Sequence, residues 1–445
     1  MKLWQKTSSN KKEVEKFTIG RDPEFDMLLA PFDVLGSMAH AIMLEKIGLL
    51  TKEELSILQK GLKEIYKEIE AGTFSIGQGV EDVHSQVEFL LTERYGDVGK
   101  KLHSGRSRND QVLVDLKLYY REAIREVVTK KEHLFNQLMV LAEKHQDDLM
   151  PGYTHTQLAM PSSFGLWFSA MAESLCEDLL LWHSAFELVN QNPLGSAAGY
   201  GSSFPLDRTL TTQLLGFENL HYNVINAQNS RGKTEKFLSF AMAASAGTLN
   251  RLSSDIIQFM NQHFGFVSFP DELTTGSSIM PHKKNPDVFE LMRAKSNQLQ
   301  AAPQEVLLQL SNLTTGYHRD LQLLKETIFP GLQTLMDCLD MASFMLDYIV
   351  VKKGLLEDPF YDYLFSVEEV NRLVLKGMPF RDAYKKVGMD IEKGTFSPRH
   401  NVSHTHEGSV GNLCLTHIHE KMSSARKRFD FKSMESKLGE LMGQP

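Results

Sequence analysis

The sequence is poor in cysteine, has no excess of basic charge and contains no long uninterrupted apolar run. Its three cysteines (Cys176, Cys338 and Cys414) stand far apart and form no Cys-x-x-Cys pair. This excludes a disulfide framework and favours reduced thiols in the cytoplasm. The net charge of −8 excludes the basic footprint of a nucleic-acid-binding protein. Because no stretch of about 18 apolar residues lacks a charge and the N-terminus lacks a signal-peptide core, we expect no membrane span.

Helical periodicity dominates what is present. Hydrophobic residues make up 42% of the chain, and over residues 115–149 they recur every three or four positions, as in one long amphipathic helix. Further runs of this kind cover residues 162–189, 236–263, 287–310 and 320–350. Helices of this length with apolar faces are best buried against one another, so the sequence predicts an all-α fold with a long central helical bundle.

Proline and glycine gather between these runs and divide the chain. We expect a small N-terminal domain over residues 1–104, a central helical bundle over residues 105–352, and a small helical C-terminal domain over residues 353–445. Long loops between long helices are uncommon and often functional. The sequence between the runs is therefore where we look for a site.

The most informative loop is residues 274–287, with the sequence TTGSSIMPHKKNPD. Gly276 permits unusual backbone angles, while Pro286 is well placed to begin the next helix. Such a loop can present a serine oxygen and a lysine ammonium to a bound anion and then close over it. By composition alone, a polar interhelical loop is the favoured interpretation.

Two further segments carry polar side chains in dense groups. Residues 103–111, HSGRSRNDQ, place two arginines beside a serine and an asparagine, all of them carboxylate donors. A capped, charged helix start would look the same. Residues 152–165, GYTHTQLAMPSSFG, contain a single histidine, His155, and a lone histidine is more often structural than catalytic.

A resemblance to a known family changes this balance. GSSIMPHKKNP matches the GSSxMPxKxNP pattern of the fumarase/aspartase superfamily, and HSGRSRNDQ resembles a motif of its argininosuccinate lyase branch. APFDVLGSMAH, EDVHSQVE, GYTHTQLAMP, GYHRDLQLLKE and RLVLKGMPFRDAYKKVG resemble further segments of that branch, so the likeness extends over most of the chain. It implies a fumarase/aspartase-like fold and the β-elimination of argininosuccinate to arginine and fumarate, with no cofactor and no metal.

The resemblance also implies the roles of particular residues. Ser277 matches the base that removes the β-proton, Lys283 matches a stabiliser of the carbanion-like intermediate, and His155 matches a histidine that pairs with a glutamate, here Glu290. The matching substrate-binding positions are Ser37, Asp82, Ser107, Arg108, Asn109, Thr154, Asn285, Tyr317, Gln322 and Lys325. A dianionic intermediate needs a fixed ammonium and amide donors in a dry site, which agrees with these residue types.

Four segments depart from the family pattern. The N-terminal WGGRF is replaced by LWQKTS at residues 3–8, a second glutamine by Met160, and a loop glutamine by His282. The family's SDRDF is replaced by NSRGK at residues 229–233, which keeps Arg231, loses both acidic residues and brings a cation, Lys233, to a segment where the family has carboxylate charge. The last change predicts an altered pocket near the arginyl end of the substrate.

Four C-terminal histidines (His404, His406, His417 and His419) stand in two His-x-His pairs, a spacing that occurs in zinc sites. No cysteine joins them at a metal-site spacing, and we interpret them as polar surface residues.

The resemblance further implies an assembly. In the family, four subunits pack their central helices together, and each active site combines segments of three chains. We therefore expect a homotetramer with composite active sites. Two alternatives remain, namely another superfamily lyase acting on a modified succinyl substrate and an inactive, crystallin-like structural homologue.

Overall fold

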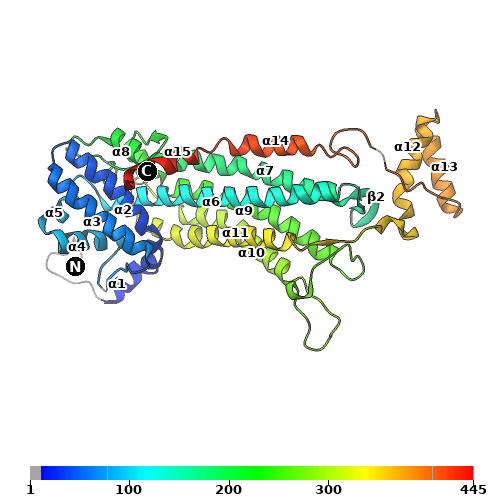
Figure 1. Cartoon of the computed structure of the whole chain (residues 1–445), viewed down its shortest axis with the longest axis horizontal. Helices are drawn as coiled ribbons and strands as arrows, with labels where there is room; N and C mark the ends of the chain where they lie inside the picture. Colours follow the sequence, from blue (N-terminus) through cyan, green and yellow to red (C-terminus); the bar gives the residue numbers. More distant parts are fainter. Residues whose placement is uncertain (1–11, 78, 403, 444–445) are drawn as a thin grey trace.

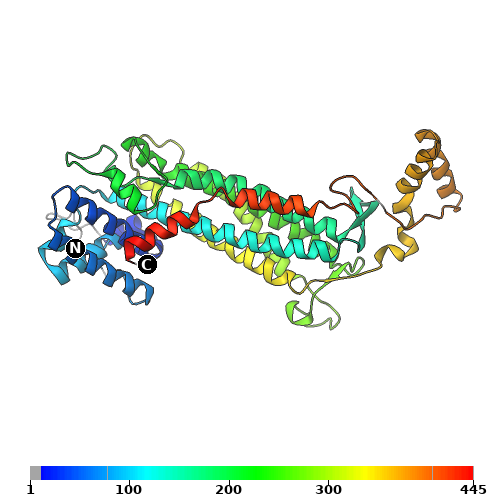
Figure 2. The same ribbon diagram turned by 45° about the horizontal axis from the view of Figure 1, so that its top comes forward.

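In a computed structural model, which describes residues 12–77, 79–402 and 404–443, the chain forms an elongated molecule built around long helices (Figure 1). The central helices lie side by side in both views of the ribbon (Figure 2). They are α6 (Arg108–Lys144), α7 (Phe164–Val189), α9 (Val224–Phe259), α10 (Asp287–Gln309) and α11 (Leu324–Leu346). At 1.5 Å per residue, the 37 residues of α6 extend over about 55 Å.

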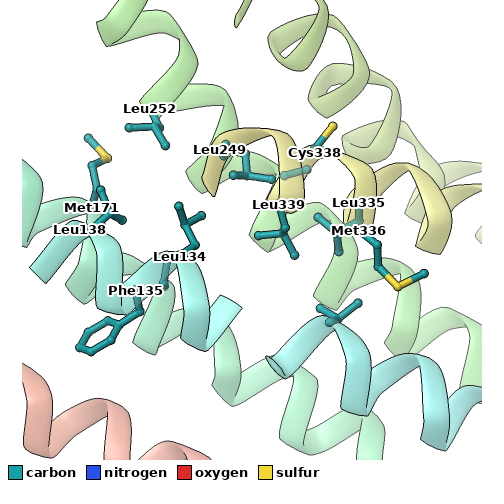
Figure 3. Close-up of a cluster of buried hydrophobic side chains, with 14 of the residues drawn as sticks. Leu134, Phe135, Leu138, Met171, Leu249, Leu252, Leu335, Met336, Cys338 and Leu339 are labelled. Carbon is teal, nitrogen blue, oxygen red and sulfur yellow. The ribbon is translucent and has the colours of Figure 1, made fainter. Parts of the chain in front are cut away.

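Apolar side chains from α6, α7, α9 and α11 interlock along the axis of this bundle. Figure 3 shows Leu134 and Leu138 of α6 near Met171 of α7, with Leu249 and Leu339 approaching from α9 and α11. Full burial of a side chain of this size stabilises the fold by about 1.5–3 kcal/mol. The predicted all-α fold with a long central helical bundle is confirmed.

The helices begin and end at places that the apolar spacing did not predict. The expected run over 115–149 is helical from Arg108 to Lys144, because Ser107 and Asp110 form a capping box and the chain turns into a strand at Leu149. The run over 236–263 begins earlier, at Val224, and has a kink at Arg231 and Gly232. The run over 320–350 begins with a 3-10 turn, η2 (Arg319–Gln322), before α11.

The N-terminal helices cluster at one end of the bundle (Figure 1). They are α1 (Lys12–Ile19), α2 (Asp22–Lys46), α3 (Lys52–Glu70), α4 (Val83–Tyr95) and α5 (Asp97–Lys101), with α8 (Arg208–Leu214) beside them. By length and composition alone α2 could cross a membrane, but 72% of its most apolar stretch is buried inside the protein, against α3, α4 and α6. Its apolar character is therefore that of a core helix.

A β-hairpin and two helices lie at the opposite end. The hairpin pairs β1 (Leu149–Thr154) with β2 (Gln157–Ser163) in antiparallel register. Beyond it project α12 (Ser366–Leu375) and α13 (Phe380–Glu392), and α14 (Leu415–Arg426) and α15 (Phe431–Met442) then return along the bundle to the N-terminal helices. Short strand pairs join β3 (Gln191–Asn192) to β4 (Asn219–Leu220) and β5 (Val267–Ser268) to β6 (Val350–Val351). The division at residues 104 and 352 stays a prediction.

Candidate active site

A polar cleft of about 480 Å³ lies where the N-terminal helices meet the bundle. Five segments supply its walls, namely the starts of α2, α4 and α6, the kink of α9, and the turn before α11. It is lined by Ile19, Asp22, Asp26, Glu81, Asp82, Ser85, His103, Arg108, Asn109, Val112, Arg231, Tyr317, Arg319, Gln322 and Lys325. Six of the predicted site residues are therefore brought together here, from three distant parts of the sequence.

One wall is built around Arg108, in the first turn of α6. Its Nε lies 3.1 Å from a carboxylate oxygen of Asp82, and its guanidinium donates to Ser85 Oγ at 3.0 Å. Asp82 also caps α4 by accepting from the backbone N–H of Ser85 at 2.7 Å. Burial alone would raise the pKa of Asp82, but attraction to His84 and Arg108 holds it below its usual value. Asp82 is thus a fixed negative charge that orients Arg108.

His103 lines the same wall. Burial, together with the positive charges of Arg106 and Arg108, lowers the pKa of His103 to about 4. The imidazole is therefore neutral near pH 7, so this wall carries no histidine charge.

The opposite wall centres on Lys325, which is only 2% exposed. Its ammonium lies 2.8 Å from Asp26 and also contacts Asp22. Burial raises the pKa of Asp22 even though Lys325 counteracts it. Gln322 donates to the backbone carbonyl of Ile19 at 2.9 Å, which ties this wall to the end of α1. A buried ammonium flanked by two carboxylates suits a ligand group that carries both charges, such as the head of an amino acid.

Several cleft residues were not predicted from the sequence. Asp22 and Asp26 are the clearest case, and their spacing of four residues places both carboxylates on one face of α2. This acidic pair directly before an apolar helical run was a usable signal. Glu81 and Arg319, which lie 3.7 Å apart across the rim, carried no comparable signal.

Ser37 and Ser107 are placed differently from the rest of the predicted binding residues. Ser37 is 1% exposed within α2, where its Oγ accepts from Arg106 at 2.9 Å, so it supports the cleft from behind and does not line it. Ser107 caps α6 by accepting from the backbone N–H of Asn109 at 3.3 Å. Its predicted contact with substrate therefore competes with a structural role.

The hairpin that carries Thr154 and His155 lies at the far end of the bundle from this cleft (Figure 1). His155 and Thr156 occupy its tip with φ values of 53° and 60°. Two successive left-handed residues are typical of a type I′ turn, which usually uses Asn and Gly. Thr154 and His155 are both exposed, and the tip thus presents them outward on a strained turn.

The loop that carries Ser277 extends from the bundle before α10 (Figure 1). Its base is closed by Asn285, whose backbone N–H donates to the carbonyl of Thr275 at 2.8 Å. Ser277 Oγ accepts from the backbone N–H groups of Met280 at 3.1 Å and Ile279 at 3.3 Å. Lys283 is exposed near the tip. Two amide donors on one hydroxyl oxygen favour the charged form of that oxygen.

Glu290 lies exposed in the first turn of α10, just after this loop. Among the hydrogen bonds and ion pairs of the described residues, none joins it to His155. The predicted residues thus form three separate groups on one chain, at the cleft, the hairpin tip and the loop.

The departures from the family pattern fall near all three of these groups. Gly232 has a φ of 86°, and a Cβ there would lie 2.3 Å from a methyl carbon of Leu310, so the kink requires glycine. The kink turns Arg231 into the cleft, with its guanidinium 5.7 Å from the centre of the Tyr317 ring, while the exposed Lys233 lines a neighbouring groove. Met160 and His282 are exposed on the hairpin and the loop. The changed residues 3–8 lie outside the described residues.

The C-terminal histidines lie elsewhere. His404 contacts Ser409 at 2.7 Å and Glu368 at 3.0 Å, and it stacks on His406 at 5.7 Å. These contacts tie the segment after α13 to α12.

Comparison with known proteins gives a consistent result. A family model described as Lyase matches residues 2–301. The argininosuccinate lyase of Bacteroides fragilis strain YCH46 is 59% identical over 443 residues, covering 100% of this chain and 99% of the relative. The argininosuccinate lyase of Thermotoga neapolitana is 40% identical over 386 residues, covering 87% and 97%.

Solved structures share the fold at much lower identity. An EDDS lyase variant with bound fumarate superposes with a TM-score of 0.77 at 21% identity, covering 98% of this chain and 95% of that chain. A class II fumarase from Schistosoma mansoni superposes with a TM-score of 0.67 at 16% identity, covering 90% and 91%.

Proposed function

Because the chain belongs to the argininosuccinate lyase family, within the fumarase/aspartase superfamily, we propose that it cleaves argininosuccinate at sites built from several copies of the chain. As a carbon–nitrogen lyase it releases arginine and fumarate. The observation that carries this function is the identity of 59% over the whole chain, with Ser277, Lys283 and Asn285 in place. The free thiols of Cys176 and Cys338 agree with a cytoplasmic location.

The separation of the three residue groups supports a composite site. The cleft holds the predicted binding residues Arg108, Asn109 and Lys325 but not the predicted base, whereas the loop and the hairpin tip carry Ser277 and His155. A homotetramer in which each cleft receives the loop of one neighbour and the hairpin of another would complete four equivalent sites.

Exposed apolar side chains on the bundle helices favour such an assembly. They occur on α7, α9, α10 and α11, and include Leu180, Leu181, Phe237, Phe240, Leu291, Leu308, Met341 and Phe344. Apolar surface spread over several helices marks a face that is covered by another protein surface. The same chain is the partner that a homotetramer requires.

In the proposed reaction, the cleft holds the two ends of the substrate. The arginyl head group, with one carboxylate and one ammonium, lies against the ion-paired cluster of Lys325, Asp22 and Asp26, with its carboxylate toward Lys325 and its ammonium toward the two carboxylates. Arg108 and Asn109, with Lys283 and Asn285 from a neighbour's loop, take the succinyl carboxylates.

The chemistry begins when a neighbour's loop closes and Ser277, acting as its alkoxide, removes the β-proton and becomes a neutral hydroxyl. The electron pair enters the adjacent carboxylate, where the ammonium of Lys283 stabilises the second negative charge. The electron pair then returns from the carboxylate to form the carbon–carbon double bond of fumarate as the C–N bond breaks, and the guanidino nitrogen takes the bonding pair of that bond and a proton. His155, oriented by Glu290 across a subunit boundary, is positioned by this scheme to supply or relay that proton.

An activity measurement tests the reaction. Purified protein is mixed separately with argininosuccinate, adenylosuccinate and aspartate, while fumarate absorbance is followed and the amine product is identified. We expect fumarate and arginine from argininosuccinate alone. Fumarate from another succinyl compound would instead support a different superfamily lyase, and no fumarate from any substrate would support an inactive homologue.

A mixing experiment tests the composite site separately. Ser277→Ala and Arg108→Ala proteins are each expected to be inactive, and they are unfolded and refolded together. If the cleft and the loop come from different chains, about a quarter of the sites in random mixed tetramers receive both intact segments. If both come from one chain, mixing restores no activity, and the composite-site proposal is wrong.

A further inference from the structure

A buried polar cluster lies directly behind the Arg108 wall of the cleft. His84 of α4 points between Asp33 of α2 and Asp115 of α6, and all three residues are at most 2% exposed. His84 Nδ1 lies 2.9 Å from Asp33 and 3.3 Å from Asp115. One imidazole therefore links three helices that the sequence places far apart.

Two of these helices, α4 and α6, carry the wall in front of the cluster. Only two positions from His84, Asp82 caps α4 and orients Arg108, while Ser85 accepts from the Arg108 guanidinium. Asp115 lies two turns along α6 from Arg108. The distance between the starts of α4 and α6 determines where Arg108 points. Both are tied to α2 just behind that point, α4 through His84 and Asp33, and the turn before α6 through Arg106 and Ser37.

The charges in the cluster are balanced without an added ion. Asp33, His84 and Asp115 are close enough together to hold a metal ion, but Arg106 already places a positive charge beside both carboxylates and donates to Ser37 on α2. Burial strongly raises the pKa of Asp115, and the nearby charge of Asp33 adds to that shift. Asp33 moves the other way, because attraction to His84 and its hydrogen bond outweigh the cost of burial and lower its pKa. Asp33 is thus the carboxylate whose charged form is stabilised beside His84, whereas the surroundings of Asp115 favour its neutral form.

We propose that His84 is a positioning residue for the substrate-binding wall, acting through its hydrogen bond to Asp33 to hold Asp82 and Arg108 in register. It touches no substrate. This inference rests on the proposed function only in taking Arg108 as a carboxylate-binding residue. Loss of the His84 side chain therefore weakens binding of the succinyl end more than it slows the chemical step.

Two substitutions at one position test this directly. The amide nitrogen of His84→Asn can occupy the place of Nδ1 and still donate to Asp33, whereas that of His84→Gln falls near Nε2 and cannot. We expect His84→Gln to raise KM by about tenfold or more with a much smaller change in kcat, and His84→Asn to recover most of that loss. Equal KM values for both variants and the wild type would overturn the proposal. An equal rise in KM in both variants would also overturn it.

A binding measurement separates this inference from the assigned reaction. The affinity of the tetramer for succinate, measured by calorimetry, reports on the wall without any turnover. We expect His84→Gln to weaken succinate binding and His84→Asn to restore it. Wild-type protein that binds succinate but releases no fumarate would refute the reaction alone, and unchanged succinate affinity in His84→Gln would refute the role of His84 alone.

A matched control comes from His145, another buried histidine with a carboxylate partner, whose Nδ1 lies 2.7 Å from Asp148 at the other end of the bundle. His145→Gln is expected to lower stability while succinate affinity stays within about threefold. A comparable loss of affinity in this control would overturn a local role for His84.

If His84→Gln fails to fold, Asp33→Asn replaces it, and Asp33→Asn should weaken succinate binding more than Asp115→Asn does. Equal effects of these two would overturn the proposal.

Discussion

The cleft and the loop of residues 274–287 carry the same kinds of side chain, but the lysine of the cleft is buried and paired, whereas those of the loop are exposed. In the cleft, Lys325 is 2% exposed and lies between two carboxylates, and Arg108 is held by Asp82 and Ser85. In the loop, Lys283 is exposed. These charged groups of the cleft are paired within a single chain, whereas Lys283 of the loop is exposed and can contact a ligand or a neighbouring chain.

This difference suggests a division of labour. A prearranged cleft binds substrate with little reorganisation, because its charges are already oriented and desolvated. A loop with few contacts can move into place, exclude water and bring a base to the reacting carbon. Stability and affinity should therefore depend mainly on cleft residues, and turnover mainly on loop residues.

The largest expected effect comes from the loop. Ser277→Ala removes the proposed base, so kcat should fall by about 10³-fold or more, while thermal stability and succinate affinity stay near wild type. The next residue, Ser278, is an exposed serine and provides the control. Ser278→Ala should keep turnover within a few fold. Near-normal turnover in Ser277→Ala would show that another group removes the proton.

Replacing one lysine in each region sharpens the comparison. Lys325→Met leaves Asp22 and Asp26 near one another without their ammonium, and loss of one partner of a buried ion pair costs about 3–5 kcal/mol. Lys283→Met removes an exposed charge and should change the free energy of unfolding by less than about 0.5 kcal/mol.

Denaturant unfolding of both variants at one protein concentration checks this, because the stability of an oligomer depends on concentration. Both variants should lose activity, but only Lys325→Met should lose stability. Similar unfolding midpoints for the two would contradict the division of labour.

Much of the fold followed from local pattern. Apolar residues at helical spacing identified the central helices, since each helix buries one face along its whole length. Their ends were less predictable, because the capping box of Ser107 and Asp110 resembles any cluster of polar residues until its hydrogen bonds are seen.

The site was predictable only in part, for a physical reason. Motifs named residues on single segments, but the contacts that make a cleft join segments far apart in the chain. Asp26 and Lys325 are separated by 299 positions, and His84 meets Asp33 and Asp115 from different helices. The hairpin was missed because its tip uses His155 and Thr156 where turn signals would place Asn and Gly. Contacts between distant residues and backbone strain at a turn arise only in the folded chain, so residue spacing alone does not predict them.

The smallest expected effect concerns that strained tip, the third group of site residues. Thr156 is β-branched and has a φ of 60°, a conformation that glycine adopts without cost but that strains a β-branched residue. Thr156→Gly should therefore stabilise the protein by about 1 kcal/mol, measured as a rise in the unfolding midpoint. Thr154→Gly provides the control, since Thr154 is the last residue of β1 and glycine there should destabilise. If Thr156→Gly stabilises the chain yet slows turnover, the strain positions His155 for reaction. If it destabilises the chain, the tip is not strained, and the hairpin belongs with the prearranged cleft instead of with the loop.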